Sequence, residues 1–459
     1  MLGNIVKFIR NHWISLGLAV FLCFGAAVVS SAYKQTAAAS GRTKIVFWHE
    51  MGGPAEVALD QMVTDFNNSQ NKYEVVPQYE GSYDEAVQKI IQTHGSKSSP
   101  ALFQSFDIST AQIMHTQYAT PIQKFITKEH YDMSPIAPAA KAFFSNNGKQ
   151  LSMPFNISQP VMYYNASLLK KYHIPTPSKS PSYSEITKTA KELYQRSHHQ
   201  VKGMTMEING WLMEEALANA HQLLVNHQDG HAGAPDKINL NNPTSQKYLK
   251  WLQENIHAKD FMNYGSGSNA AANEIAGFMS GKVGIFFNTS AYISQLTVNP
   301  KLKLGISYFP HPDGVKRNGV SIGGASLWIG KDKSKNVQNG AFEFIKYALK
   351  PEEQAKWQKA TGYMAINKNA ENTKTLKDLY AKYPEAKVPF EQLSTVKPNN
   401  ANSGLLMEGM QYTRQLEQTA MEQTYEGANI DSTLNSVNNQ MNSNLQRINK
   451  ANNNFKTVQ

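Results

Sequence analysis

The alternation of strand-type and helix-type segments near the start of this chain restricts its fold more than any other feature. Short apolar runs at 44–48, 73–77 and 101–106 predict three strands. Helices are predicted between them, one beginning at Pro54 and one after the capping box Ser82-Tyr83-Asp84-Glu85. Strands that alternate with helices predict an α/β sheet, whose ligand sites lie at the carboxyl ends of the strands.

The later part of the chain indicates a second domain. Pro154 and Pro160 lie within a β-rich stretch, Leu151 to Asn165, which indicates a crossing between domains. Residues 281–287 predict a buried strand, and helices are predicted at 213–226, 341–349, 351–361 and 432–450. The last of these carries Leu434, Val437, Met441, Leu445 and Ile448 at helical spacing, so we expect it to dock on the core. Residues 451–459 are expected to be a frayed tail.

The N-terminus has the layout of an export signal. Lys7 and Arg10 precede an apolar run from Ile14 to Val29, and the small residues Ser30-Ser31-Ala32 follow it. This predicts either a signal peptide over residues 1–32 or an uncleaved membrane anchor. The protein is therefore expected outside the plasma membrane, at the cell surface or in a periplasm. Its one cysteine, Cys23, lies in this segment, so the mature chain has no disulfide and no thiol nucleophile.

The charge and the motifs exclude several function classes. The formal net charge is +10, but the basic residues are spread singly, which argues against a nucleic-acid partner. No Gly-x-Ser-x-Gly or His-Glu-x-x-His motif occurs. His227 and His231 flank Asp229, yet no third partner is evident for a metal. We therefore expect no catalytic residue, no metal and no cofactor.

Three separate segments together suggest a site for a small phosphorylated polyol. Arg414 offers a guanidinium fork that matches phosphate geometry, and Tyr363 offers a flat wall with a hydroxyl. Gly323-Gly324 allows backbone N–H groups to approach a ligand.

The chain resembles the extracellular solute-binding proteins of ABC importers, and among them those for glycerol-3-phosphate. The matching segments are 47–51, 76–83, 154–165, 323–328, 359–363 and the surroundings of Arg414. The resemblance implies the two-lobe, maltose-binding-like (type II) periplasmic-binding-protein fold, with discontinuous lobes that close around a hinge. We expect one lobe at 43–154 plus 305–350 and the other at 155–304 plus 351–450.

The same resemblance implies the ligand contacts. They are Tyr83, Asp107, Ser158, Trp211, Thr289, Ser290, Gly324, Tyr363 and Arg414. Tyr83 and Asp107 are assigned to the first lobe, Gly324 near the return to it, and the others to the second. Asp107 is expected to accept from glycerol hydroxyls, away from the phosphate, or else to cap a helix. Either Thr289 or Ser290 is expected to donate to the ligand. Arg414 is expected to bind the phosphate, the alternative being an ion pair with Glu417 or Glu408.

The resemblance also implies the biological role and its alternatives. The protein would be a monomeric, non-enzymatic receptor that delivers sn-glycerol-3-phosphate or glycerophosphodiesters to permease subunits at the membrane. Ile208 stands where the family has a second indole, so we hypothesise that glycerophosphocholine binds at least as well as glycerol-3-phosphate. The alternatives are an oligosaccharide receptor of the same fold and a secreted glycerophosphodiester hydrolase.

Overall fold

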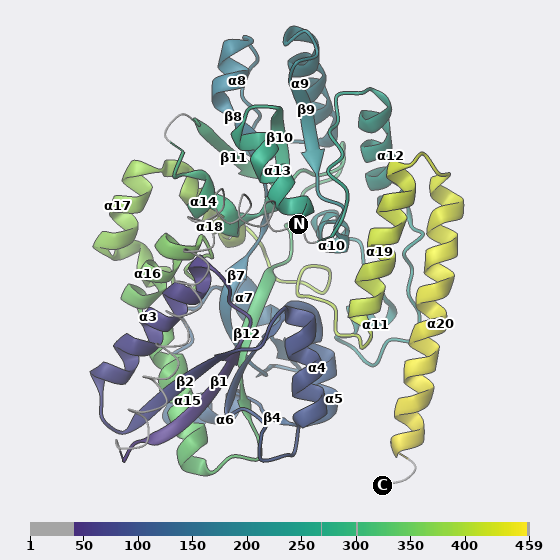
Figure 1. Cartoon of the computed structure of the whole chain (residues 1–459). Helices are drawn as coiled ribbons and strands as arrows, with labels where there is room; N and C mark the ends of the chain where they lie inside the picture. Colours follow the sequence, from purple (N-terminus) through teal and green to yellow (C-terminus); the bar gives the residue numbers. More distant parts are fainter. Residues whose placement is uncertain (1–40, 268, 300–301, 457–459) are drawn as a thin grey trace, which may run out of the picture.

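The computed structural model describes residues 41–267, 269–299 and 302–456, which form two large β-sheets surrounded by helices, together with a small two-stranded sheet (Figure 1). We call the halves built on these sheets the first and the second lobe. The predicted signal peptide or anchor at 1–32, with Cys23, lies outside the described residues. In the described part of the chain, no helix combines the length and the apolar character that crossing a membrane requires.

The first lobe is built on a six-stranded sheet in the order β2-β1-β3-β12-β4, with β7 also paired to β12. Its strands are β1 (Thr43–His49), β2 (Tyr73–Tyr79), β3 (Leu102–Phe106), β4 (Ala119–Thr120), β7 (Met153–Ser158) and β12 (Gly323–Gly330). β1 is parallel to β2 and β3, whereas β12 is antiparallel to β3, β4 and β7. The three strands predicted at the start of the chain are confirmed.

Helices pack on this sheet as the sequence predicts. α3 (Pro54–Ser69) contacts β2, α4 (Tyr83–Thr93) contacts β3, and α15 (Lys335–Ala348) contacts β1. The apolar stripe of α3, which ends at Phe66, is buried. Ser82 and Glu85 form the predicted capping box at the start of α4. This cap places Tyr83 at the carboxyl-terminal edge of the sheet.

The second lobe is built on a four-stranded sheet in the order β11-β8-β10-β9. Its strands are β8 (Pro160–Asn165), β9 (Lys202–Met206), β10 (Val283–Thr289) and β11 (Leu304–Tyr308). α9 (Tyr183–Arg196) packs on β9, and α13 (Ala270–Met279) packs on β10. Beside them, α10 (Gly210–Asn219) contacts α12 (Pro243–His257) and α19 (Met410–Tyr425). The predicted strand at 281–287 is confirmed as β10.

Shorter elements connect these layers. They are η1 (Asp107–Ser109), α5 (Thr110–Thr116), α6 (Gln123–Glu129), α7 (Pro138–Phe143), β5 (Ser145–Asn146), β6 (Lys149–Gln150), α8 (Ala166–Lys171), α11 (Asn226–Asp229), η2 (Ser290–Tyr292), α14 (Ile293–Leu296), η3 (Lys368–Asn372), α17 (Lys374–Lys382), η4 (Pro384–Lys387) and α18 (Val388–Ser394).

The chain crosses between the lobes at Gln159, which separates β7 from β8. This confirms the crossing predicted between Leu151 and Asn165. The side-chain amide of Gln159 donates to the carbonyl of Ser321, 3.0 Å away, and accepts from Gln392. Since Ser321 lies on the return from β11 to β12, the two crossing segments are tied together and form a hinge.

The lobe boundaries differ from the expected ones. The boundary expected between 154 and 155 falls inside β7, which belongs to the first sheet through Ser158. α16 (Pro351–Thr361), expected in the second lobe, packs against α3 of the first lobe. Tyr363, which follows α16, packs against the same core. Apolar contacts of α16, led by the buried Trp357, explain this placement.

Two helices also end elsewhere than the sequence predicts. The helix expected at 213–226 is α10, which ends at Asn219 because His221 adopts a left-handed backbone with φ 59°. The C-terminal helix α20 runs from Ile430 to Lys456, past the frayed end expected from 451. Polar contacts explain the extension: Asn449 donates to the carbonyl of Pro235 and Asn452 to Glu408.

Candidate ligand site between the lobes

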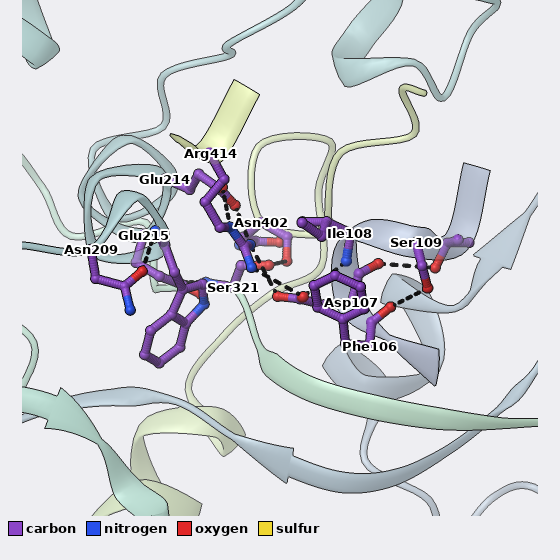
Figure 2. Close-up of polar contacts among 12 residues, drawn as sticks. Phe106, Asp107, Ile108, Ser109, Asn209, Glu214, Glu215, Ser321, Asn402 and Arg414 are labelled. Atoms are coloured by element: carbon purple, nitrogen blue, oxygen red, sulfur yellow. Dashed lines mark hydrogen bonds and ion pairs between the residues drawn. The ribbon is translucent and has the colours of Figure 1, made fainter. Parts of the chain in front are cut away.

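Arg414 on α19 lies where the two lobes meet and is held by carboxylates from both (Figure 2). From the first lobe, Asp107 follows β3 directly and accepts from Nη1 and Nη2 at 3.3 and 3.2 Å. From the second lobe, Glu214 on α10 accepts from Nε and Nη2, both at 2.7 Å. Both edges of the guanidinium therefore carry a carboxylate, and the ion pair with Asp107 joins the lobes.

The local sequence explains why Glu214 reaches Arg414. Asn209 caps α10 by accepting from the N–H of Trp211. Gly210 lies so close to the main chain of Arg414 that a Cβ atom there would overlap its carbonyl oxygen. The two helices thus touch at their backbones, and Glu214, one turn further along α10, faces the guanidinium.

Further carboxyl groups surround the pair and are buried. Burial raises the pKa of Glu417 and of Glu215 well above the ordinary value. Burial also raises the pKa of Asp107, a shift that the guanidinium of Arg414 opposes. The pKa of Arg414 is raised because Asp107 and Glu214 outweigh the effect of burial. The guanidinium therefore stays charged, while Glu215 and Glu417 favour their neutral forms.

A second cluster consists of phenols and an amide on the first lobe. Tyr83 stacks on Phe106, with ring centroids 5.1 Å apart and an angle of 4° between planes. The side chain of Asn156 on β7 donates to the hydroxyl of Tyr83 at 2.9 Å. Tyr363 lies close to Tyr83, and its ring stacks on that of Trp357, with ring centroids 6.1 Å apart. Since Phe106 precedes Asp107, the phenols lie next to the Arg414 cluster.

The glycine strand and the indole meet at the same place. Gly323 lies against the ring of Trp211, where an added Cβ would come within 2.7 Å of the indole. Gly324 pairs with Ile157 and adopts φ +101°, and a Cβ there would overlap the carbonyl oxygen of Asn156. Ser158, buried, pairs with Gly323. The structure thus brings Trp211 of the second lobe onto the first sheet.

Thr289 and Ser290 lie at the hinge side of the site. The Ser290 hydroxyl accepts from the N–H of Gln159 at 3.2 Å, and the Thr289 hydroxyl accepts from the N–H of Ala291. Gly362 packs on the backbone of Ala291, which brings this loop beside Tyr363. Both hydroxyls therefore have local partners, and their contact with a ligand stays a prediction.

The lobe assignment of several site residues needs correction. Ser158 lies on β7 and Tyr363 packs on the first core, so both belong to the first lobe and not to the second. Arg414 pairs with Asp107 and Glu214, whereas the alternative prediction named Glu417 or Glu408. Asp107, expected away from the phosphate group, contacts the residue expected to bind that group.

The lobes are closed on this site. A cavity of about 30 Å³ lies beside Asp107, Glu214 and Ser321, enough for a water molecule but not for a solute. Two further polar contacts cross between the lobes: Gln411 donates to Asp84 at 2.9 Å, and His115 lies 3.3 Å from Glu408. The segment from Glu408 to Arg414 therefore carries the polar contacts that link α19 to the first lobe.

Sequence reasoning missed three polar residues of the site. Asn156 and Glu214 have the contacts described above, and Glu50, which follows β1, is buried with neither carboxyl oxygen hydrogen-bonded among the described residues. Glu50 lies in the segment 47–51 that matched the family, and it closely follows a predicted strand. Asp107 also follows a predicted strand, so the same signal could have identified Glu50 as a candidate.

The histidine loop has a structural role. Asp229 accepts from the N–H groups of Leu224 and Val225, each at 2.9 Å, and His231 contacts the carbonyl of Gly404. Within the described residues, no group of three or more His, Cys, Asp or Glu side chains is arranged to hold a metal ion.

Comparison with known proteins agrees with this architecture. Residues 61–388 match the family of bacterial extracellular solute-binding proteins. The sn-glycerol-3-phosphate-binding periplasmic protein UgpB of Yersinia pseudotuberculosis is 26% identical over 423 residues, covering 91% of this chain and 92% of that protein. UgpB of Escherichia coli is 25% identical over 414 residues, covering 88% and 93%.

Two solved structures share the fold. UgpB from Mycobacterium tuberculosis in complex with glycerophosphocholine has a TM-score of 0.72 at 19% identity, covering 89% of this chain and 99% of that one. The sugar-binding protein MalE from Xanthomonas citri has a TM-score of 0.73 at 17% identity, with the same coverage. The expected two-lobe, maltose-binding-like fold is confirmed. The match over most of its length and the shared two-lobe architecture show that this chain belongs to the family of bacterial extracellular solute-binding proteins.

Proposed function

We propose that this protein is the receptor of an ABC importer that captures sn-glycerol-3-phosphate and glycerophosphodiesters such as glycerophosphocholine. The observation that carries the proposal is Arg414, a permanently charged fork at the junction of the lobes. The relatives that bind glycerol-3-phosphate, by their names, support the choice of ligand.

The arrangement around Arg414 suggests how a phosphate would bind. Glu214 accepts hydrogen bonds from Nε and Nη2 of Arg414 at 2.7 Å, whereas Asp107 accepts longer ones from Nη1 and Nη2 at 3.3 and 3.2 Å. A phosphate would therefore displace Asp107 and leave Glu214 to orient the guanidinium. Ligand that contacts both lobes would favour the closed state through its higher affinity for that state, and the permease would recognise the closed receptor.

The protein acts in this proposal without catalysis and as a monomer. It is exported, and it meets the membrane through permease subunits or through its N-terminal segment. Tyr83, Ser158, Trp211, Gly324 and Tyr363 would line the ligand, with Thr289 or Ser290 as a further donor. Ile208 is buried in the core of the second lobe, and the preference for diesters over the monoester stays a hypothesis.

A thermal-shift and calorimetry panel tests the proposal on the purified protein. Glycerol-3-phosphate or glycerophosphocholine is expected to give the largest rise in melting temperature, and maltose none. Arg414→Lys keeps the charge but loses the forked guanidinium, so it is expected to lower the affinity for phosphate ligands by roughly a hundredfold. A larger shift with maltose would favour an oligosaccharide receptor. Release of choline from glycerophosphocholine would favour a hydrolase.

A further inference from the structure

Glu50 is a buried acid in the first lobe that no structural contact explains. It follows the last residue of β1, its side chain is 8% exposed, and neither carboxyl oxygen has a hydrogen-bond partner among the described residues. A buried polar group without a partner destabilises a fold by roughly 1–3 kcal/mol, so each such group needs an explanation. Glu50 therefore calls for a functional explanation.

The surroundings of Glu50 place it at the proposed ligand site. Its backbone N–H donates to Gln104 at 3.0 Å, and Gln104 donates to Asn156 at 2.6 Å. Asn156 in turn donates to Tyr83. Burial is the main cause that raises the pKa of Tyr83 and of Tyr363, and the carboxyl group of Glu50 lies close enough to both phenols to contribute. A hydrogen-bonded series thus leads from the backbone of Glu50 to Tyr83, one of the two phenols proposed to line the ligand.

The position of Asp107 leaves a role for a second acid. The sequence assigned the hydroxyl end of the ligand to Asp107, but its two oxygens accept from Arg414. Glu50 is a carboxyl group of the same sheet edge whose oxygens are not engaged in this way.

We propose that Glu50 binds the hydroxyl groups of the ligand's glycerol moiety while Arg414 binds the phosphate. This inference rests on the proposed function and adds the residue that distinguishes a glyceryl phosphate from other phosphates. A carboxyl group offers two oxygens to two neighbouring hydroxyls, and a neutral carboxyl both donates and accepts. Burial raises the pKa of Glu50, which is compatible with that neutral form.

The test compares two phosphates that differ in their hydroxyls. Glycerol-3-phosphate carries the vicinal diol, and propyl phosphate lacks it. Glu50→Leu is expected to lower the affinity for glycerol-3-phosphate by roughly tenfold to a hundredfold, because the diol then loses its hydrogen-bonding partner. Propyl phosphate is expected to bind Glu50→Leu and the wild-type protein within about threefold, since Arg414 is untouched.

Two further measurements separate an effect on ligand binding from damage to the fold. They are the stability of the unliganded Glu50→Leu variant and the affinities of a matched control variant. Without ligand, Glu50→Leu is expected to melt no lower than the wild-type protein, because the variant removes a buried acid that lacks a partner. Glu352→Gln on α16 changes an exposed acid of the same lobe and is expected to change neither affinity. The isosteric Glu50→Gln retains hydrogen-bonding capacity, so its affinity for glycerol-3-phosphate is expected to lie between those of the wild type and Glu50→Leu.

The outcomes distinguish this inference from the proposed function. Unchanged affinity of Glu50→Leu for glycerol-3-phosphate would overturn the inference and leave the proposed function standing. An equal loss for both phosphates would also overturn it, since that result indicates general damage to the site. If the wild-type protein binds neither glycerol-3-phosphate nor glycerophosphocholine, the proposed function fails first and the inference with it.

Discussion

Asp107 and Arg414, 307 residues apart in the chain, form a two-contact ion pair that bridges the lobes. Glu214 holds the same guanidinium more closely from its own lobe, at 2.7 Å. The pair is thus made between an arginine already oriented by one carboxylate and an acid that moves with the other lobe. If the proposed function holds, lobe closure and phosphate recognition both depend on the side chain of Arg414.

Asp107→Asn is expected to shift the unliganded protein toward the open state. Losing charged hydrogen bonds corresponds to about 1.5 kcal/mol, roughly a tenfold change in the ratio of closed to open forms. Single-molecule energy transfer between dyes on cysteines introduced at Lys97 and Lys250, both exposed, measures the distance between lobes. Asp84→Asn, which changes an exposed contact to the neutral Gln411, is the control and should shift the ratio less. An unchanged ratio in Asp107→Asn would mean that burial of Asp107 offsets its attraction to Arg414.

Arg414→Ala is expected to lower stability as well as ligand binding. The truncation leaves Asp107 and Glu214 without their counter-charge. We expect a loss of roughly 3 kcal/mol in the free energy of unfolding, measured by urea denaturation. Adding Asp107→Asn and Glu214→Gln should restore most of this loss, and no recovery would contradict the charge argument.

Gly324→Ala is expected to destabilise the first lobe at its junction with the hinge. The position has φ +101°, and the new Cβ would overlap the carbonyl oxygen of Asn156. We expect a loss of at least about 2 kcal/mol, together with weaker ligand binding because Asn156 holds Tyr83. Gly314→Ala provides the control, since its φ is +71° and no atom lies within 4 Å of an added Cβ. Equal losses at both positions would show that φ alone, and not the contact, matters.

The stability of the protein is expected to fall between about pH 4 and pH 7 because of Asp229. Burial raises the pKa of Asp229 to about 7 in the folded state, from an ordinary value of 3.8. An acid with a raised folded pKa contributes full stability below its unfolded pKa, and this is lost as pH rises through the folded value. Asp229→Asn keeps an oxygen for the N–H groups of Leu224 and Val225 but does not ionise.

The comparison of Asp229→Asn with the wild-type protein isolates this effect. The variant should be more stable at pH 7.5, and its advantage should be on the order of 2 kcal/mol smaller at pH 5. Urea denaturation at pH 7.5 and at pH 5 measures the difference in stability between the variant and the wild-type protein. An advantage that does not depend on pH would mean that Asp229 is not the titrating group.

Local patterns predicted the first lobe well because its elements carry their own signals. Pro54 opens α3 and Ser82 caps α4, and each signal involves only neighbouring residues. The placement of α16 could not be predicted in this way, since it depends on the packing of Trp357 against residues far along the chain. The end of α10 at Asn219 likewise depends on the left-handed backbone of His221, which helical periodicity does not reveal.

For the candidate site, the sequence named residues that lie together in the structure but did not predict their contacts. The residues named from the sequence include Tyr83, Asp107 and Arg414, and the structure places them at one junction. The pairing of Arg414 with Asp107 depends on how the two lobes meet, and neither local sequence contains that information. Glu50 was missed because an acid at the end of a strand indicates a site only once its partners, or their absence, are known.

The position of β12 has a consequence for how the polypeptide matures. This strand lies between β3 and β4 and also pairs with β7, although it comes from residues 323–330. The amino-terminal strands consequently lack their central neighbour until most of the polypeptide has emerged, and such distant pairing slows folding. A polypeptide that stays incompletely folded during synthesis is suited to threading through an export channel in extended form.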